Sequence, residues 1–131
     1  MKGFKTDIEN VTLTNSDFRR VLYTGKHSQL VLMSLKPGEE IGMEVHNTVD
    51  QFFRFEKGTG AVIIDGVSRE VKDGDAAIVP SGAMHNVVNT GDSELKLYTI
   101  YSPPEHIDGT VRHTKNDALA MPEEFDGKTT E

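Results

Sequence analysis

The chain has 131 residues, no cysteine and a net charge of −7. This length fits one domain, and the lack of cysteine excludes disulfides, thiolate metal ligands and a cysteine nucleophile. The negative charge disfavours nucleic acid and anionic membrane surfaces as partners. The sequence shows no apolar run near the ~20 residues of a membrane helix and no signal-peptide pattern at its start, so we expect a soluble, cytoplasmic protein.

Residues 4–15 come first and carry no clear period, so an edge strand is one interpretation of them. From residue 17 to 103, apolar or alternating segments are interrupted every 8 to 12 residues by Gly, Pro, Asp or Asn. This spacing is typical of an all-β barrel or sandwich. The expected strands are 18–24, 29–36, 41–46, 51–57, 60–65, 67–72, 76–79, 85–89 and 95–102, with Asp65-Gly66 as a hairpin turn between two of them.

The composition changes after Pro103-Pro104. Residues 104–131 are polar and acidic, with one weak helical segment at 116–121. We expect an appendage that packs along the barrel and frays at its end. It either caps the barrel mouth, bringing His106, His113 or an acid to a ligand, or pairs with a second subunit.

Two short segments carry the side chains suited to metal chemistry. Glu44 and His46 are two residues apart, so on a strand both project from one face, and Gln51 can reach the same point from the next strand. In the second segment, Pro80-Ser81-Gly82 predicts a turn before a strand that opens with His85. Together the two segments supply imidazole, carboxylate and amide donors.

The two segments resemble the paired motifs of the cupin superfamily, G-x5-H-x-H-x3,4-E-x6-G and G-x5-P-x-G-x2-H-x3-N. All spacings match, and the resemblance covers about residues 29–102. Two positions differ in residue type, since Glu44 replaces the first histidine and Gln51 replaces the glutamate. The motif positions are Gly38, Glu44, His46, Gln51 and Gly58 in the first, and Gly74, Pro80, Gly82, His85 and Asn89 in the second.

The resemblance implies a double-stranded β-helix over residues 1–103, a metal inside one open end, and a homodimer. Carried over position by position, the metal ligands are Glu44, His46, Gln51 and His85. Two histidines and one carboxylate suit a divalent transition metal with open positions, which leaves Fe, Mn, Zn, Ni and Co as alternatives. The motif glycines and Pro80 are interpreted as turn formers without chemistry of their own.

Strand alternation suggests which side chains line a small-molecule pocket around the metal. Phe53 and Phe55 share the phase of Gln51, Val87 follows His85 inward, and Tyr101 is in phase with Leu97 and Thr99. His27 and Gln29 are further pocket candidates. Arg54 is expected to face outward, and without an Arg/Lys pair at the site a phosphorylated substrate is less attractive.

The resemblance extends to small cupins grouped with mannose-6-phosphate isomerases and to those that linearise unsaturated uronates. It implies a metal-dependent, isomerase-like enzyme acting on a sugar or another hydroxy-carbonyl compound, in which Glu44 leaves the metal and moves the proton. An Fe(II) dioxygenase and a non-catalytic module that binds metal or a small ligand are the alternatives.

Overall fold

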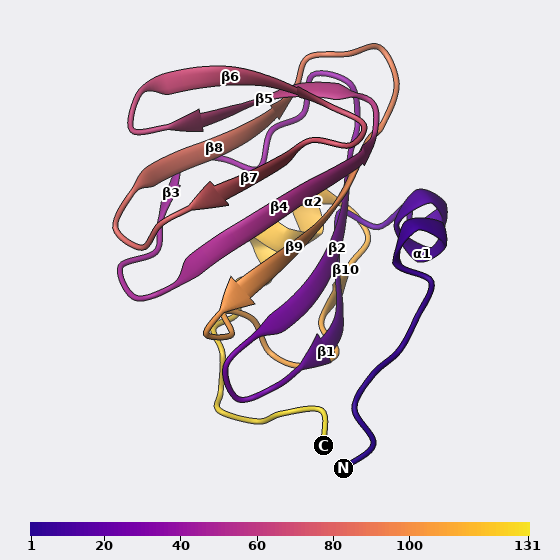
Figure 1. Ribbon diagram of the computed structural model, residues 1–131, viewed down its shortest axis with the longest axis vertical. Coiled ribbons are helices and arrows are strands. Elements are labelled where there is room, and N and C mark those ends of the chain that lie inside the picture. The colour runs from indigo at the N-terminus through magenta and orange to yellow at the C-terminus, as the bar shows by residue number, and fades with distance from the viewer.

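The computed structural model describes residues 1–131 and shows two antiparallel sheets packed face to face (Figure 1). One sheet has the order β10-β1-β2-β9-β4-β7 and the other β3-β8-β5-β6. This confirms the all-β, double-stranded β-helix. The strands are β1 (Arg19–Thr24), β2 (Gln29–Leu35), β3 (Glu44–Val45), β4 (Asp50–Lys57), β5 (Thr59–Ile64), β6 (Val67–Lys72), β7 (Ala76–Val79), β8 (Met84–Asn89), β9 (Leu95–Ser102) and β10 (Val111–Arg112).

The third strand is shorter than the sequence predicts. Within β3 only Glu44 and Val45 pair with β8, whereas the expected strand began at residue 41, and an isolated bridge joins Glu40 to Val88. Before β3 the chain still follows β8, because the Ile41 N–H donates to the Val87 carbonyl and the Gly42 N–H donates to the Asn86 side chain. Gly42 has a φ of +112°, which breaks the regular ladder at this point.

The interpretation of residues 4–15 as an edge strand is wrong, because the helix α1 (Ile8–Thr14) occupies them. The Asp7 side chain caps its first turn by accepting from the Asn10 N–H. Its β-branched residues favour strands, but this preference is weak and packing overrides it. The Lys96 ammonium donates to the carbonyl of Asn15 and so fixes α1 against β9, on the outer face of the six-stranded sheet.

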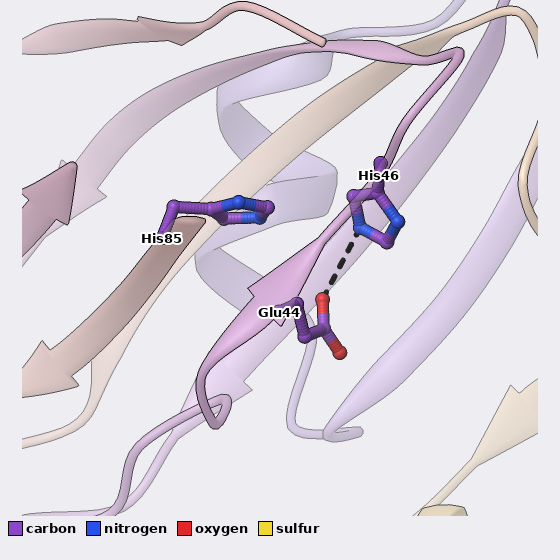
Figure 2. Close-up of side chains that lie close together, drawn as sticks. All are labelled: Glu44, His46 and His85. Carbon is purple, nitrogen blue, oxygen red and sulfur yellow. Dashed lines mark ion pairs between the residues drawn. The ribbon is translucent and has the colours of Figure 1, made fainter. Parts of the chain in front are cut away.

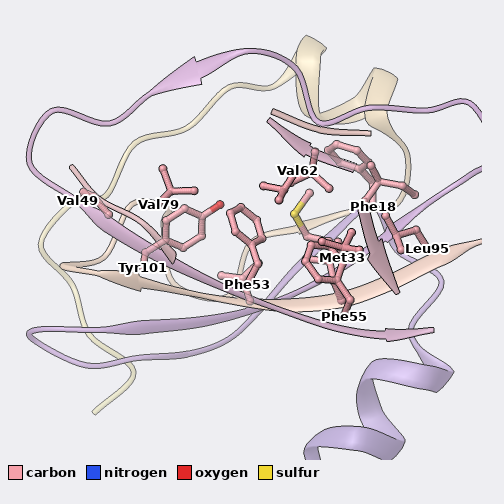
Figure 3. Packing of buried hydrophobic residues seen from close by; sticks show 14 of the residues in the cluster. Phe18, Met33, Val49, Phe53, Phe55, Val62, Val79, Leu95 and Tyr101 are labelled. Atoms are coloured by element: carbon pink, nitrogen blue, oxygen red, sulfur yellow. The ribbon is translucent and has the colours of Figure 1, made fainter. Parts of the chain in front are cut away.

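The hydrophobic core fills the space between the sheets (Figure 3). Along β4, Phe53 and Phe55 point inward, while Arg54 and Glu56 form an ion pair of 3.0 Å on the other side. Along β9, Leu95, Leu97 and Tyr101 point inward in the same way. At one open end of the core, polar residues take the inward positions of several strands: Gln29, Gln51, His85 and Thr99. At the other end of β8, the buried Asn89 donates to the carbonyls of Leu35 and Ser93.

The tail after β9 returns along the barrel. It adds β10 beside β1, forms the helix α2 (Lys115–Ala120) one residue from the expected range, and ends where Glu131 accepts from the N–H groups of Lys2 and Gly3. The two termini therefore lie close together (Figure 1). Neither α1 nor α2 has the length and apolar character to cross a membrane.

Two motif glycines differ in what surrounds them, and this gives a stability prediction. Both have a positive φ, +92° at Gly58 and +91° at Gly74, but a Cβ at Gly58 would lie 2.7 Å from the Glu94 carbonyl oxygen, whereas Gly74 has no atom within 4 Å. Gly74→Ala should cost about 1–2 kcal/mol of unfolding free energy from backbone strain. Gly58→Ala should cost about 2 kcal/mol more because backbone must also move. Equilibrium urea unfolding measures both, and equal losses would contradict the packing role of Gly58.

Candidate metal centre

Three side chains from two paired strands converge at the open end of the barrel (Figure 2). Glu44 on β3 lies directly opposite His85 on β8, and His46 follows β3. One donor atom from each of Glu44, His46 and His85 lies within 4.8 Å of the other two. Since donors around one transition metal at ~2.1 Å stand about 3 to 4 Å apart, this set needs only a small contraction to share an ion.

Gln51 completes the set from β4. Its Nε2 donates to Thr99 Oγ1 at 3.0 Å, and Thr99 in turn donates to the Phe52 carbonyl at 2.8 Å. This chain fixes the amide so that Gln51 Oε1 faces His85 Nε2 at 3.2 Å. The sequence-predicted ligand therefore lies next to the histidine ring with its oxygen turned toward it.

The environment of His85 fits a metal better than a hydrogen bond to Gln51. Burial lowers the pKa of His85, so the ring is neutral near pH 7 and carries one N–H. The Ala83 carbonyl lies 3.2 Å from Nδ1 and can accept that N–H. Nε2 and Gln51 Oε1 then face each other with lone pairs only, at the separation expected of two adjacent ligands of one ion. The residues present thus fit a divalent metal.

His46 lies between two carboxylates. Its Nδ1 is 3.4 Å from Glu105 Oε1, and its Nε2 is 3.3 Å from Glu44 Oε2. Glu105 first and Glu44 second raise the pKa of His46 to about 9. Burial works to raise the pKa of Glu44, but the contact with His46 outweighs it and the pKa is lowered. A metal at Nε2 has to displace a proton, and it leaves the Nδ1–H directed at Glu105.

A pocket of about 260 Å³ opens beside Glu44 and His46. Most of its wall comes from the start of β1 and from the tail, so the tail closes one side of the pocket within its own chain. Besides Glu44 and His46, the lining residues are Phe18, Arg19, Ile41, Glu105, His106, Lys115, Ala118, Leu119, Pro122 and Glu123.

Comparison with known proteins decides the family. Residues 31–101 match the cupin domain family. The chain belongs to the cupins. The Bacillus subtilis protein YrkC is 50% identical over 125 residues, which cover 91% of this chain and 67% of YrkC. The crystal structure of BH2720 from Bacillus halodurans superposes with a TM-score of 0.90 at 46% identity, over 92% of this chain and 96% of that one.

A more distant relative is the oxalate-binding protein of Thermotoga maritima. It is 25% identical over 100 residues, which cover 76% of this chain and 79% of that protein. The cupin described here shares with that protein the fold and part of the sequence.

The sequence-predicted pocket residues of this cupin lie mostly beneath the candidate metal site. The Phe53 ring is 6.4 Å from His85, Phe55 lies deeper and stacks on Phe53, and Tyr101 stands edge-on to His46 at 6.0 Å (Figure 3). Val87 is fully buried beside His85. None of these four lines the pocket of about 260 Å³.

Two further predicted pocket residues are not at the centre. His27 is exposed in the turn between β1 and β2. Gln29 is buried, but its amide is used to bind the tail: it donates to the His106 carbonyl at 2.7 Å and accepts from the N–H groups of Glu105 and His106 at 3.2 and 2.9 Å. Gln29 therefore positions two pocket residues without lining the pocket.

The tail is held by a buried carboxylate. The Glu123 side chain is 4% exposed, and its oxygens lie 2.8 Å from His106 Nδ1, 3.4 Å from Arg112 Nη2 and 3.8 Å from Arg19 Nη1. Burial works against the charged form, yet His106 and the two arginines hold the pKa of Glu123 below its usual value. These contacts tie residues 104–131 to β1 and β10.

Several pocket residues were missed by the sequence reasoning. Arg19 had a signal, because it lies in phase with Val21 on the inward face of β1, where a charge is unexpected. Glu105, Lys115 and Glu123 lie in the tail, where no period or spacing relates them to the barrel motifs. His106 was expected near a ligand only in the interpretation that the tail caps the barrel mouth, and it lines the pocket.

The metal assignment predicts the effect of removing single ligands. His46→Ala and His85→Ala should each lower the metal content from about one equivalent to near zero, because each removes one donor from a four-donor set. Elemental analysis of protein purified without chelator or affinity nickel measures this, and circular dichroism checks the fold. His113→Ala is the matched control, since His113 is 76% exposed and pairs with Asp17. Full metal content in both variants would contradict the assignment.

The raised pKa of His46 predicts proton release on metal binding. At pH 7 the ring is protonated, because its pKa is about 9, so one bound metal should release about one proton. The apparent affinity should therefore rise about tenfold per pH unit from pH 7 and level off above pH 9. Calorimetric titration in two buffers of different ionisation enthalpy measures the proton count. Binding at pH 7 without proton release would refute this description of His46.

Proposed function

We propose that the protein is a metal-dependent enzyme that moves a proton within a small hydroxy-carbonyl compound, such as a sugar or a sugar acid. The observation that carries the proposal is the pairing of two features. Four candidate metal donors, Glu44, His46, Gln51 and His85, lie close together, and two of them, Glu44 and His46, line a pocket of about 260 Å³. The same pocket contains Glu105, a carboxylate outside the predicted ligand set.

The metal, one of Fe, Mn, Zn, Ni or Co, would polarise the substrate carbonyl as a Lewis acid. Glu105 is the group placed to move the proton, because its side chain is 29% exposed and one of its oxygens contacts His46 at 3.4 Å. It takes a proton from the hydroxyl-bearing carbon beside the carbonyl and returns it to the carbonyl carbon, while the hydroxyl proton passes to the former carbonyl oxygen, so that the carbonyl and the hydroxyl exchange places. Glu44 fills the same role only where it leaves the metal.

His46 and Tyr101 support this arrangement. With Nε2 on the metal, the Nδ1–H of His46 donates to Glu105 and orients it. Burial raises the pKa of Tyr101, so its hydroxyl stays protonated. The hydroxyl lies 3.2 Å from His106 Nε2, while the ring stands edge-on to His46. The small pocket limits the substrate to a compound of few atoms.

A second candidate is an Fe(II) dioxygenase. Glu44, His46 and His85 form a two-histidine, one-carboxylate set with their donors within 4.8 Å of one another, which is the ligand type of non-haem iron oxygenases. The oxalate-binding relative favours a third reading, a module that binds a small carboxylate without turnover.

We also propose a homodimer. The outer face of the six-stranded sheet carries a cross-strand row of apolar residues, Leu30, Ile100, Phe52 and Ile78. Ile78 is 67% exposed in the single chain. A second copy packing on this row would remove it from water. Cytoplasmic location stays a prediction.

The proposed role of Glu105 predicts a loss of turnover without a loss of metal. Metal-loaded protein should exchange the proton beside the carbonyl of small hydroxyaldehydes, hydroxyketones or their acids with deuterium from solvent, as followed by NMR. Glu105→Gln should slow this exchange by about 10²-fold or more, because it removes the general base. Glu124→Gln, which changes an exposed carboxylate of the same tail, is the control.

Metal content separates the outcomes of this experiment. If Glu105→Gln loses exchange and metal together, Glu105 only orients His46 and the base is Glu44. Oxygen consumption by the iron-loaded protein without any exchange would favour the dioxygenase. Ligand-induced stabilisation without either activity would favour the binding module.

A further inference from the structure

Arg19 is a buried cation without a hydrogen bond to any residue. Its side chain is 9% exposed, and its Nε is fully enclosed without a hydrogen-bond partner. The nearest carboxylate oxygen, Oε1 of Glu123, is 3.8 Å from Nη1, which is beyond hydrogen-bond distance. The only other recorded interaction is with the Phe18 ring, whose centroid lies 5.5 Å from Cζ.

Such a guanidinium is unusual in a folded protein. It carries five N–H donors and cannot lose its charge, and about nine in ten buried polar groups in proteins are hydrogen-bonded. Glu123 offsets part of its charge but forms no hydrogen bond to it, since Oε1 lies 3.8 Å from Arg19 Nη1 and 2.8 Å from His106 Nδ1, while Arg112 approaches Oε2 at 3.4 Å. Arg19 also lines the pocket that contains Glu44 and His46. Its open donors are therefore available to a molecule in that pocket.

The pocket contains cations as well as carboxylates. Lys115 lines it together with Arg19 and forms no ion pair with any residue. The carboxylates of Glu44 and Glu105 both face His46. Glu123 is the one carboxylate of the pocket within 4 Å of either cation, at 3.8 Å from Arg19 Nη1.

We propose that Arg19, assisted by Lys115, binds the carboxylate of a small ligand whose other end, a pair of oxygens such as a hydroxy acid offers, is held at the metal centre. This inference rests on the proposed function and narrows it from sugars in general to acids. The volume of about 260 Å³ equals that of about nine water molecules, which suits a ligand of roughly ten heavy atoms. The planar fork of arginine matches a carboxylate in two parallel hydrogen bonds.

The structure favours a carboxylate over a phosphate. Glu123 lies 3.8 Å from Arg19 and reduces the positive potential there, so the site suits a single negative charge better than the two of a phosphate monoester. Arg19 and Lys115 also form the cationic pair that the barrel motifs alone did not supply.

A ligand comparison on cobalt-loaded protein tests the inference. Glycolate offers only the metal-binding end, malate adds a distal carboxylate, and 3-phosphoglycerate carries a phosphate instead. The cobalt absorption spectrum reports binding at the metal. In the wild type, malate should bind about tenfold or more tightly than glycolate, as expected of hydrogen bonds between charged groups, and more tightly than 3-phosphoglycerate.

Variants assign the difference to Arg19. Arg19→Gln should reduce the malate-to-glycolate ratio to about one while glycolate affinity and metal content stay unchanged. Arg19→Lys, which keeps the charge and loses the fork, should give an intermediate ratio. Arg69→Gln on β6, which removes an exposed arginine without an ion pair, is the control and should leave the ratio unchanged. Thermal melting checks that each variant is folded.

The outcomes separate the two proposals. An unchanged ratio in Arg19→Gln, or no preference for malate in the wild type, overturns the role of Arg19 and leaves the metal centre standing. Stronger binding of 3-phosphoglycerate overturns the choice of carboxylate. If glycolate and malate both leave the cobalt spectrum unchanged, the proposed function fails and this inference fails with it.

Discussion

Several polar side chains near the open end of the barrel are buried between the two sheets. Because water does not reach them, their donors and acceptors need partners within the protein. Leaving one such group unpaired costs about 1–3 kcal/mol. Gln51 and Thr99 meet this constraint as a chain that ends on the Phe52 carbonyl, and His85 meets it through the Ala83 carbonyl. Each pairing uses one end of its side chain and fixes its rotation. The remaining atoms, Gln51 Oε1 and His85 Nε2, then face each other, and the metal centre follows from how the barrel satisfies its own polar groups.

The same constraint attaches the tail. The Gln29 amide has two donors and an acceptor oxygen to satisfy at the end of β2. It donates to Thr24 Oγ1 and to the His106 carbonyl, and it accepts from the N–H groups of Glu105 and His106. Gln29 on β2 pairs with Tyr101 on β9, so its amide lies beside Tyr101, one of the predicted pocket residues. The same amide holds the segment of the tail that carries Glu105. The pocket wall is thus positioned by a residue that does not line it.

What the sequence predicts well here depends on short-range geometry. Glu44 and His46 share a face because side chains alternate along a strand, and the motif spacing places His85 on the strand that pairs with Glu44. The missed features depend on long-range contacts. Gln29 and His106 are 77 residues apart in the chain, and no period links them. Helix α1 was missed because its capping and its attachment through Lys96 outweigh the strand preference of its residues.

Desolvation explains why the two departures from the cupin motif, Glu44 for histidine and Gln51 for glutamate, occur together. Gln51 is 2% exposed, whereas the Glu44 side chain is 35% exposed. Without a bound metal, a carboxylate at position 51 would have to be held charged among Phe53, Thr99 and Tyr101, where desolvation is costly. At position 44 the charge stands at the rim, beside His46 and in reach of water. The centre therefore keeps one negative ligand while its most buried position is neutral. A ligand that brings its own carboxylate can then approach without repulsion from position 51, and Arg19, which lines the same pocket as Glu44, attracts it.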